Sequence, residues 1–167
     1  MAQELTTVAQ WKEYFTKRLD ASQFMALATT GQEGPWVCPV YFAFDERFNL
    51  FFLSAPSSLH MRNIEKNAAV ACAVFDSRQG NLDEVVGVQI RGKAQFVTPE
   101  EAERAFNIYF TATPARKPSG PAHTPVAYTR PDAVWRLVRV VPQAAWVYSE
   151  QEFEGGREKV PQEVLQQ

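Results

Sequence analysis

The sequence predicts a mainly β protein, folded as a small barrel with flanking helices. Short apolar segments separated by turn-forming residues fill most of the chain, and only a few segments carry helix-start signals. Several of the apolar segments are nearly continuous, which indicates strands buried on both faces. The length of 167 residues and the hydrophobic fraction of 46% suit a single domain with a sizeable core. We expect residues 1–150 to form this domain and residues 151–167 to form a polar, mobile tail.

Two helices are predicted from their first residues. Residues 7–10 (TVAQ) have the capping-box pattern, and residues 98–101 (TPEE) combine a capping Thr, a Pro at the first helical position and a Glu that can reach back. An apolar stripe at helical spacing follows each start. The first stripe is Val8, Trp11, Phe15 and Leu19, and the second is Ala102, Ala105, Phe106 and Tyr109.

The remaining periodic segments read as strands. They cover residues 23–30, 36–45, 49–54, 69–76, 86–97, 134–141 and 144–149. Turn-forming residues at 31–35 and 45–49 separate the first three. Pro39 lies inside a strand, which predicts an edge or a bulge at that point. Residues 112–130 have no periodicity and are rich in Pro, Gly and Ser, so we expect a disordered or functional loop, such as a lid over a ligand.

Composition and missing motifs exclude several functions. The net charge of −2, with both signs scattered, gives no case for nucleic acid or an anionic membrane, and no apolar run is long enough to span a bilayer. Cys38 and Cys72 are expected to be reduced core thiols, so we expect a cytoplasmic protein. The chain has no phosphate-loop or nucleophile-elbow motif. With only His60 and His123 available, neither a hydrolytic triad nor a metal site is predicted.

The segment from Ser54 to Asn67 carries the clearest functional signal. It predicts a strand end, a turn and a short helix capped by Ser57 or Ser58. The first turns of this helix carry His60 and Arg62 and no acidic residue, although a helix N-terminus favours negative charge. Serine hydroxyls, free backbone N–H groups and two cationic side chains would together suit a phosphate group. A solvated helix end with scattered charges explains the same pattern.

A second signal lies in residues 87–93 (GVQIRGK). In a strand, Val88 and Ile90 face one way while Gln89 and Arg91 face the other. A Gln amide offers both a donor and an acceptor, which suits the imide edge of a flavin ring. A polar outer strand face accounts for this spacing equally well. Gly92 predicts a bulge.

The order and spacing of four stretches resemble the FMN-binding split barrels related to pyridoxamine 5′-phosphate oxidase. These stretches are LATTGQEGPWVCPVYF, LFFLSAPSSLHMRNI, NAAVACAVFD and GVQIRGKAQFV, and the resemblance runs from about Gln23 to Tyr148. It implies a Greek-key-like split β-barrel closed by helices, with FMN at the interface of a homodimer. We also expect a homodimer because the apolar faces of strands such as 134–141 exceed what one small barrel should expose.

The resemblance also implies site residues. Pro39, Val40 and Tyr41, with the neighbouring Cys38, would line the flavin and its ribityl chain, and Leu53 and Ser54 would approach from the next strand. Ser58, Leu59 and His60 fall where the authentic oxidases hold the phosphate with Ser-Arg-Lys. The missing cations weaken phosphate binding unless His60 and Arg62 compensate. Asn63 completes a Ser-x-His-x-x-Asn pattern similar to that of other members, and Gln89 matches a Gln that contacts the ring. Leu59, His60, Cys38 and Ala43 replace four cations of the authentic oxidase, which argues against that vitamin-B6 activity.

Three classes of function therefore remain open. The first is an FMN-dependent oxidoreductase acting on an unidentified small molecule, or its counterpart that uses a deazaflavin cofactor. The second is a non-catalytic protein that binds or sequesters flavin or haem, with His60 or His123 as an axial haem ligand. The third is a barrel that has lost its cofactor and acts only as a dimeric interaction module.

Overall fold

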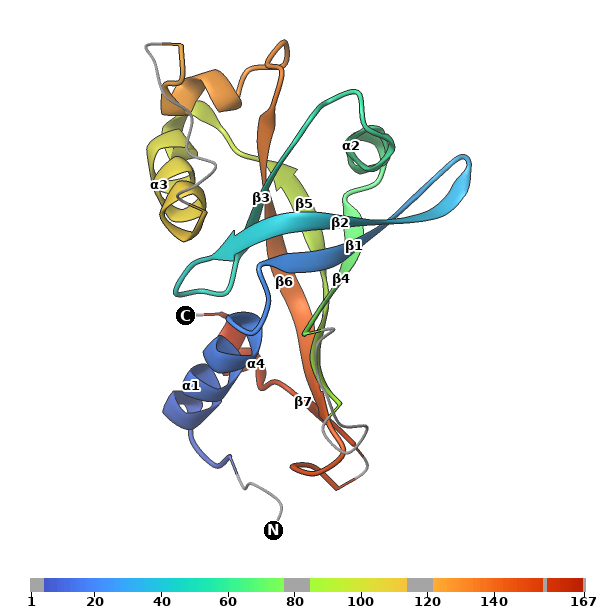
Figure 1. Cartoon of the computed structure of the whole chain (residues 1–167), viewed down its shortest axis with the longest axis vertical. Coiled ribbons are helices and arrows are strands. Elements are labelled where there is room, and N and C mark those ends of the chain that lie inside the picture. The colour runs from blue at the N-terminus through green and yellow to red at the C-terminus, as the bar shows by residue number, and fades with distance from the viewer. Residues whose placement is uncertain (1–4, 77–84, 114–121, 155, 167) are drawn as a thin grey trace.

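Seven antiparallel strands form the body of the molecule in the computed structural model (Figure 1), which describes residues 5–76, 85–113, 122–154 and 156–166. The strands are β1 (Phe24–Gly31), β2 (Gly34–Phe44), β3 (Leu50–Ser54), β4 (Ala69–Phe75), β5 (Val86–Phe96), β6 (Arg136–Ser149) and β7 (Arg157–Lys159). Their order is β3-β2-β1-β4-β5-β6-β7, and β3 also pairs with β6. The first six strands therefore close into a barrel, and β7 extends the sheet beyond β6. The arrangement of β4 beside β1 is that of a Greek key, so the predicted fold class is confirmed.

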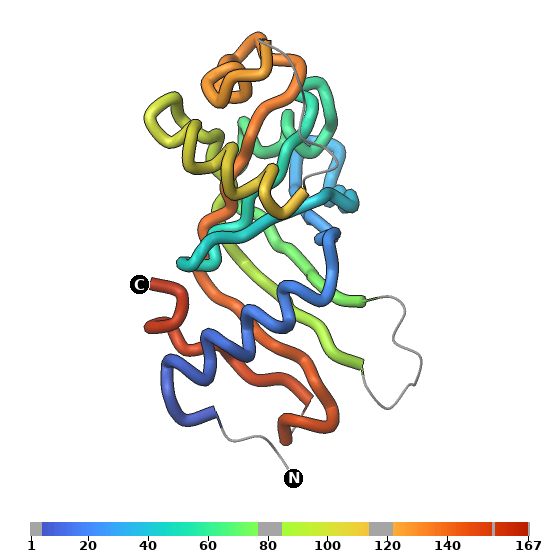
Figure 2. Tube along the Cα trace, turned by 60° about the vertical axis from the view of Figure 1, so that its left-hand side comes forward, coloured from blue at the N-terminus to red at the C-terminus, as the bar shows by residue number. Residues whose placement is uncertain are grey.

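Helices cover parts of the barrel. They are α1 (Val8–Leu19), α2 (Leu59–Lys66), α3 (Ala102–Ala112), α4 (Gln162–Leu165) and the 3₁₀ segments η2 (Pro99–Glu101) and η4 (Pro125–Tyr128). In Figures 1 and 2, α1 and α4 lie together beside the lower half of the barrel, and α3 lies beside its upper half with η4. Met61 and Ile64 of α2 are buried in the main core, so this short helix plugs the upper end of the barrel.

Both predicted helix starts are found. Thr7 and Gln10 form a reciprocal capping box, and Trp11, Phe15 and Leu19 are buried below it. The second start differs in detail, because residues 99–101 form a 3₁₀ turn before α3 begins at Ala102. The predicted stripe of α3 is buried as expected and packs on the outer side of β2 and β3.

The first hairpin confirms the prediction at Pro39. Residues 24–31 of β1 pair with residues 34–41 of β2, whereas β2 pairs with β3 only over residues 42–44. Pro39 therefore lies where β2 is an edge strand, at a position where no second neighbour needs its missing N–H group. This hairpin projects beyond the barrel on the right of Figure 1.

One strand was predicted as two. Residues 134–141 and 144–149 belong to the continuous strand β6, which keeps pairing with β5 on both sides of Pro142. The register shifts between Arg91 and Gly92, which confirms the predicted bulge. A Cβ atom on Gly92 would lie 2.5 Å from the carbonyl oxygen of Val141, so only glycine fits there.

The prediction of a mobile tail after residue 150 is wrong for the described residues. The chain turns back, forms β7 against β6, and ends in α4 beside α1. Phe153, Val160, Val164 and Leu165 are buried in the main core. The sequence hides this contribution because Phe153 and Val160 each stand alone, Val164 and Leu165 form only one pair, and the four show no periodic pattern.

The loop predicted at 112–130 is only partly described. Residues 112 and 113 end α3, residues 114–121 lie outside the described part of the chain, and residues 125–128 form η4. Tyr128 is buried against Phe106 and Phe110 of α3. This end of the segment is therefore packed on α3.

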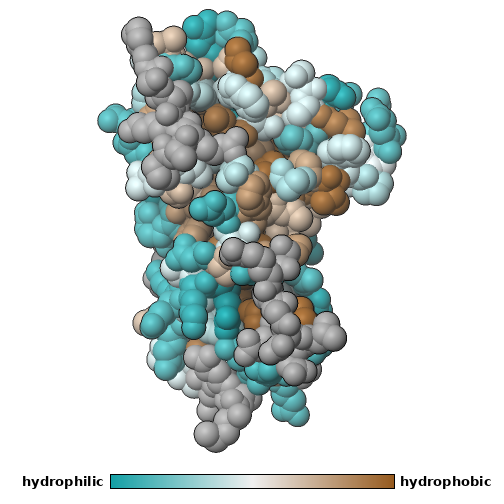
Figure 3. Space-filling model, viewed as in Figure 1, coloured by the Kyte–Doolittle hydropathy of each residue, from teal (hydrophilic) through white to brown (hydrophobic). Residues whose placement is uncertain are grey.

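Burial on both strand faces is only partly found. In β4, buried inward residues alternate with more exposed outward ones, and Phe75 on its outward face is 52% exposed. Phe24 and Val37 are exposed on the neighbouring strands. Figure 3 shows brown apolar side chains over the centre of this view and toward the projecting hairpin. Among the described residues, the outer face of β1, β4 and the hairpin part of β2 is therefore uncovered, whereas α3 covers β2 near Tyr41 and Ala43.

Candidate functional site

Three polar side chains meet where β3 ends and α2 begins. The Nε2 atom of His60 lies 2.7 Å from the hydroxyl oxygen of Ser54 and 3.2 Å from that of Ser58. The hydroxyl of Ser58 donates to the carbonyl oxygen of Ala55 at 2.8 Å. We call Ser54, Ser58 and His60 the hydroxyl cluster. It brings together two residues predicted to hold the phosphate, Ser58 and His60, and one predicted to approach the flavin from β3, Ser54.

His60 sits deeper than a solvent-facing cation would. The residue is 8% exposed, its ring lies against Phe52, and burial lowers its pKa below the ordinary 6.5. The ring is therefore neutral at pH 7. A neutral ring that carries its proton on Nε2 donates to Ser54 and leaves the Ser54 hydroxyl hydrogen free for a ligand. His60 thus orients hydroxyl groups in this structure, which differs from the imidazolium expected beside a phosphate.

Two further residues of the predicted site hold α2 in place. The guanidinium of Arg62 donates to the carbonyl oxygen of Ser57, at the entrance to the helix. Asn63 is buried and donates from Nδ2 to the hydroxyl of Thr29 at 3.1 Å. A Cβ atom on Gly31 would lie 2.0 Å from the Asn63 side-chain oxygen, so α2 and β1 meet closely there. Asn63 therefore fixes the helix, while Arg62 remains exposed beside the cluster.

A separate pocket lies on the outer face of the barrel, and we call it the sheet-face pocket. Its volume is about 450 Å³, and its lining comes from β1, β2, β4, β5, β6 and β7. The lining residues are Ala26, Ala28, Val37, Ala71, Cys72, Ala73, Gln89, Ile90, Arg91, Trp146 and Arg157. Ala26 pairs with Ala73, and Ala28 pairs with Ala71. The four small side chains make a flat apolar floor, on which a planar ring can approach the backbone.

Polar groups stand along one side of this floor. Gln89 lies opposite Ala73 on β4 and opposite Trp146 on β6, and it is exposed toward the pocket. The guanidinium of Arg157 lies over the Trp146 ring, 6.0 Å from its centroid. The pocket therefore offers an amide, an indole and a cation beside an apolar floor. Such a mixture is typical of small-molecule sites.

The β2 and β3 residues of the predicted site divide between two environments. Val40 points into the main core, the larger cluster of buried residues, which α1 and α4 also join. Tyr41 and Leu53 pack against a second, smaller cluster, which lies between α3 and strands β2 and β3. Pro39 is exposed on the outer face, in the same cross-strand row as Ala26, Ala73 and Gln89. Of the predicted residues, Gln89 lines the sheet-face pocket, and the hydroxyl cluster lies outside its lining.

Sequence reasoning missed the alanine floor and the pair formed by Trp146 and Arg157. A Trp inside an apolar strand reads as core, and Arg157 lies in the segment expected to be a tail. The alternation of alanines at 26 and 28 and again at 71 and 73 was the available signal, because it marks two strands with one shared small-residue face.

The haem alternative depends on the surroundings of His60 and His123. Neither of the two His residues lines the sheet-face pocket, and both contacts made by His60 Nε2 are to hydroxyl oxygens. His123 lines a second pocket of about 310 Å³ with Tyr128 and Trp135, and its Nδ1 atom lies 2.8 Å from the Tyr128 hydroxyl. Among the described residues, no group of three or more His, Cys, Asp or Glu side chains could hold a metal ion.

No helix in the described ranges is long and apolar enough to cross a bilayer.

The structure is a split barrel: a closed antiparallel barrel plugged by a short helix. It has two candidate ligand sites, the hydroxyl cluster at the helix start and the sheet-face pocket. The family model of pyridoxamine 5′-phosphate oxidase matches residues 12–136, and the chain belongs to this family. No curated protein matches the sequence.

Solved structures with the same fold have low sequence identity. A haem-binding protein from Mycobacterium smegmatis is 16% identical with a TM-score of 0.72, and the match covers 98% of this chain and 61% of that one. A protein of unknown function from Agrobacterium tumefaciens is 20% identical with a TM-score of 0.68, covering 96% and 62%. The chain thus spans less than two thirds of either protein. An FAD-binding protein from Mesorhizobium loti is 20% identical with a TM-score of 0.57, covering 79% and 89%.

Proposed function

We propose that this chain is an FMN-binding flavoprotein and an oxidoreductase that acts on a small molecule, with the flavin at a homodimer interface. The observation that carries the proposal is the sheet-face pocket, which combines a flat floor of four alanines with the amide of Gln89. Membership of the pyridoxamine 5′-phosphate oxidase family and the structural likeness to an FAD-binding protein support the same cofactor class.

The residues present fit the two ends of FMN. The alanine floor accepts a flat ring, and the Gln89 amide can both donate to and accept from the polar edge of that ring. At the other end, the first N–H groups of α2 have no partner within the helix, and the Ser54 hydroxyl can donate beside them. In a homodimer with the flavin between the two chains, the ring can contact the sheet-face pocket of one copy while the phosphate contacts the hydroxyl cluster of the other.

The chemistry divides between cofactor and protein. Bound flavin supplies transfer of a hydride or of single electrons. With flavin bound, the alanine floor and the Trp146 side chain would exclude water from the pocket, and the Gln89 amide would orient the polar edge of the ring. Neutral His60 would hold the Ser54 hydroxyl in position, and with its proton on Nε2 it would leave the hydroxyl hydrogen for the phosphate.

The test compares FMN with riboflavin, which lacks the phosphate. We expect the protein purified from cells to show flavin absorption and to bind both ligands. Ser54→Ala should weaken FMN about tenfold to a hundredfold, because one charge-assisted hydrogen bond contributes roughly 1.5–3 kcal/mol, and should leave riboflavin nearly unchanged. Gln89→Leu should weaken both ligands, and Ser22→Ala, a serine outside both sites, should weaken neither. Absence of binding to either flavin, or equal losses for both in Ser54→Ala, would refute the assignment.

One observation favours haem as the second candidate. His123 lines an apolar pocket, its Nδ1 atom is held by Tyr128, and a partner on one ring nitrogen is how proteins orient a histidine ligand. The haem-binding protein from Mycobacterium smegmatis shares the fold. A Soret band in the purified protein that disappears in His123→Ala but persists in His60→Ala would establish this candidate in place of flavin.

A further inference from the structure

Arg136 occupies the strand position that directly faces the hydroxyl cluster. It is the first residue of β6 and pairs with Ser54, the last residue of β3. Directly opposed residues of antiparallel strands project from the same face, with Cβ atoms roughly 4.5–5.5 Å apart. Val138, two residues further along β6, is buried in the main core, so Arg136 projects to the inner side of the barrel. Both strands reach the upper end of the barrel, where α2 lies (Figure 1).

The charge of Arg136 has no ion-pair partner among the described residues. Its guanidinium lies over the Phe96 ring, 3.9 Å from the centroid, and its Nε atom is buried without a hydrogen-bond partner there. Burial lowers the pKa of this guanidinium, and the charge of Glu65 on α2 acts in the opposite direction. Arg18 and Arg139 also have a buried Nε without a partner, but each is paired with a carboxylate. A partly buried charge without a partner is costly, and a bound anion would offset this cost.

The hydroxyl cluster has no charged group of its own. His60 is neutral at pH 7, because burial lowers its pKa. The guanidinium of Arg62 donates to the carbonyl oxygen of Ser57, and the residue is exposed, where water screens its charge. A phosphate monoester carries roughly −1.5 to −2 charges at pH 7. Serine hydroxyls and helix N–H groups can orient such a group, but a partly buried cation is needed to balance it.

We infer that Arg136 is the cation that binds the phosphate group held at the hydroxyl cluster, and that it makes this site select FMN over riboflavin. Rotation about its side-chain bonds brings the guanidinium from Phe96 toward Ser54, its neighbour on β3. Two N–H groups of one guanidinium lie in a plane and suit two phosphate oxygens at once. The inference rests on the proposed function, which assigns the flavin phosphate to this cluster.

The experiment measures the dissociation constants of FMN and riboflavin for the full-length protein and its variants. Arg136→Gln should weaken FMN about tenfold to a hundredfold, the range for loss of one charge-assisted hydrogen bond. Riboflavin should change little, because it lacks the phosphate. Arg136→Lys keeps the charge but not the planar pair of N–H groups, so it should restore only part of the FMN affinity. Lys66→Gln removes an exposed cation at the far end of α2 and should affect neither ligand.

Inorganic phosphate gives a second readout that does not depend on flavin. A ligand that binds only the folded state raises the midpoint of thermal unfolding as its concentration rises. We expect phosphate to raise this midpoint above its value in sodium chloride of the same ionic strength. The difference should be largely lost in Arg136→Gln and kept in Lys66→Gln. A role of Arg136 in packing alone would change the midpoint itself and leave the response to phosphate intact.

The outcomes distinguish this inference from the proposed function. Equal losses for FMN and riboflavin in Arg136→Gln would mean that Arg136 supports only the fold, and would overturn the inference. If Arg136→Gln binds FMN as wild type does while Ser54→Ala binds it more weakly, the inference also fails and the proposed function stands. If neither flavin binds but phosphate protects wild type and not Arg136→Gln, the proposed function fails and Arg136 remains the phosphate-binding cation. Should Arg136→Gln not fold, Arg136→Lys decides by the same comparisons.

Discussion

At the scale of single residues, His60 shows how position changes the role of a side chain. The sequence places an ionisable ring in the first turn of a helix, where a solvent-facing imidazolium would suit a phosphate. The ring instead turns inward, against Phe52 and between the hydroxyls of Ser54 and Ser58. Burial penalises its charged form and lowers its pKa. In the proposed phosphate site, His60 would therefore act through the hydroxyl of Ser54.

The lowered pKa of His60 predicts a pH dependence of stability. In the unfolded chain the ring titrates near ~6.5, and in the folded chain it binds its proton only at lower pH. Between these two values the unfolded state holds more protons, so the free energy of unfolding falls as pH falls through this window. Above about pH 7 both states are neutral and the full stability is present. Denaturant unfolding of wild type from pH 8 down to about 5.5 should show this decline.

The matched variant is His60→Gln, which keeps a polar side chain but does not titrate. The only other histidine is His123, and it remains in both proteins. His60→Gln should therefore lack the part of the pH dependence that begins near the unfolded pKa. Identical slopes in wild type and variant would show that the ring titrates alike in both states, against its observed burial.

Residue roles were predictable from the sequence only where a local pattern encodes them. The outward direction of Gln89 and Arg91 follows from strand alternation and is confirmed. The inward turn of His60 and the pairing of Asn63 with Thr29 depend on how α2 enters the barrel end. Tertiary packing determines how deeply α2 is inserted, and the spacing of residues within the helix does not predict it.

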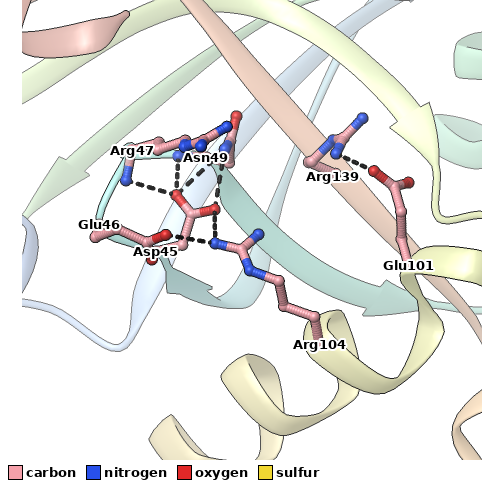
Figure 4. A network of polar contacts seen from close by, with 7 residues as sticks. All are labelled: Asp45, Glu46, Arg47, Asn49, Glu101, Arg104 and Arg139. Atoms are coloured by element: carbon pink, nitrogen blue, oxygen red, sulfur yellow. Dashed lines mark hydrogen bonds and ion pairs between the residues drawn. The ribbon is translucent and has the colours of Figure 1, made fainter. Parts of the chain in front are cut away.

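At the scale of elements, a buried carboxylate joins the β2–β3 turn to α3 (Figure 4). The Asp45 side chain is fully buried and accepts the backbone N–H groups of Arg47 and Asn49 at 3.0 and 2.9 Å. Arg104 of α3 reaches the same carboxylate at 3.0 Å and also contacts the exposed Glu46. Phe48, within the turn, has a left-handed backbone with φ of 60°. Asp45 therefore stabilises both a strained turn and the attachment of a helix.

Replacing Asp45 should be costly, because two backbone N–H groups of the turn would lose their acceptor and Arg104 would lose its buried partner. We expect Asp45→Ala to lower the free energy of unfolding by about 1–3 kcal/mol. Glu46→Ala removes only the exposed partner of Arg104 and should cost no more than about 0.5 kcal/mol. Denaturant unfolding of the two variants measures the difference. Equal and small losses in both would mean that the turn does not depend on Asp45.

The C-terminal segment gives a second prediction at this scale. Phe153, Val160, Val164 and Leu165 are buried in the main core, and fully burying such a side chain contributes roughly 1.5–3 kcal/mol. Together they approach the 5–15 kcal/mol by which a typical domain is stable. A chain ending at residue 150 should therefore lose its cooperative unfolding transition, whereas a chain ending at residue 165 should keep it. Circular dichroism during thermal unfolding checks both. A stable chain ending at residue 150 would contradict the packing.

Element prediction succeeded where periodicity or capping was strong. The capping box at Thr7 and the stripe of α3 are found as predicted. Both depend on residues close together in the sequence, the first through local hydrogen bonds and the second through burial of one helix face. The division of β6 into two strands failed, because Pro142 signals an interruption that the bulge opposite Gly92 absorbs. The packed C-terminal segment was missed because its burial depends on contacts with the barrel and α1.

At the scale of the whole molecule, the apolar surface relevant to a dimer lies in two places. Leu137, Val138 and Val140 of β6 are fully buried within one chain, whereas Val134 and Trp135, which precede β6, are 76% and 49% exposed. The second place is the outer face of β1, β4 and the hairpin part of β2, where Phe24, Val37 and Phe75 are between 44% and 60% exposed. Contiguous apolar surface of this kind marks an interaction site. It borders the sheet-face pocket, of which Val37 is a lining residue.

If two copies meet over this face, dimerisation and flavin binding are coupled. A ligand held between two chains strengthens their association, and association strengthens ligand binding by the same factor. We expect sedimentation velocity to show a dimer at micromolar concentration, and FMN to shift the dissociation to lower protein concentration. Val37→Asp places a charge on the uncovered face and should weaken both the dimer and FMN binding. Val126→Asp, at a residue 48% exposed beside α3, should weaken neither. A different result would contradict the coupling: wild type stays monomeric, yet it binds FMN, and Val37→Asp leaves the FMN affinity unchanged. That result would place the flavin within one chain and remove the interface from the proposed site.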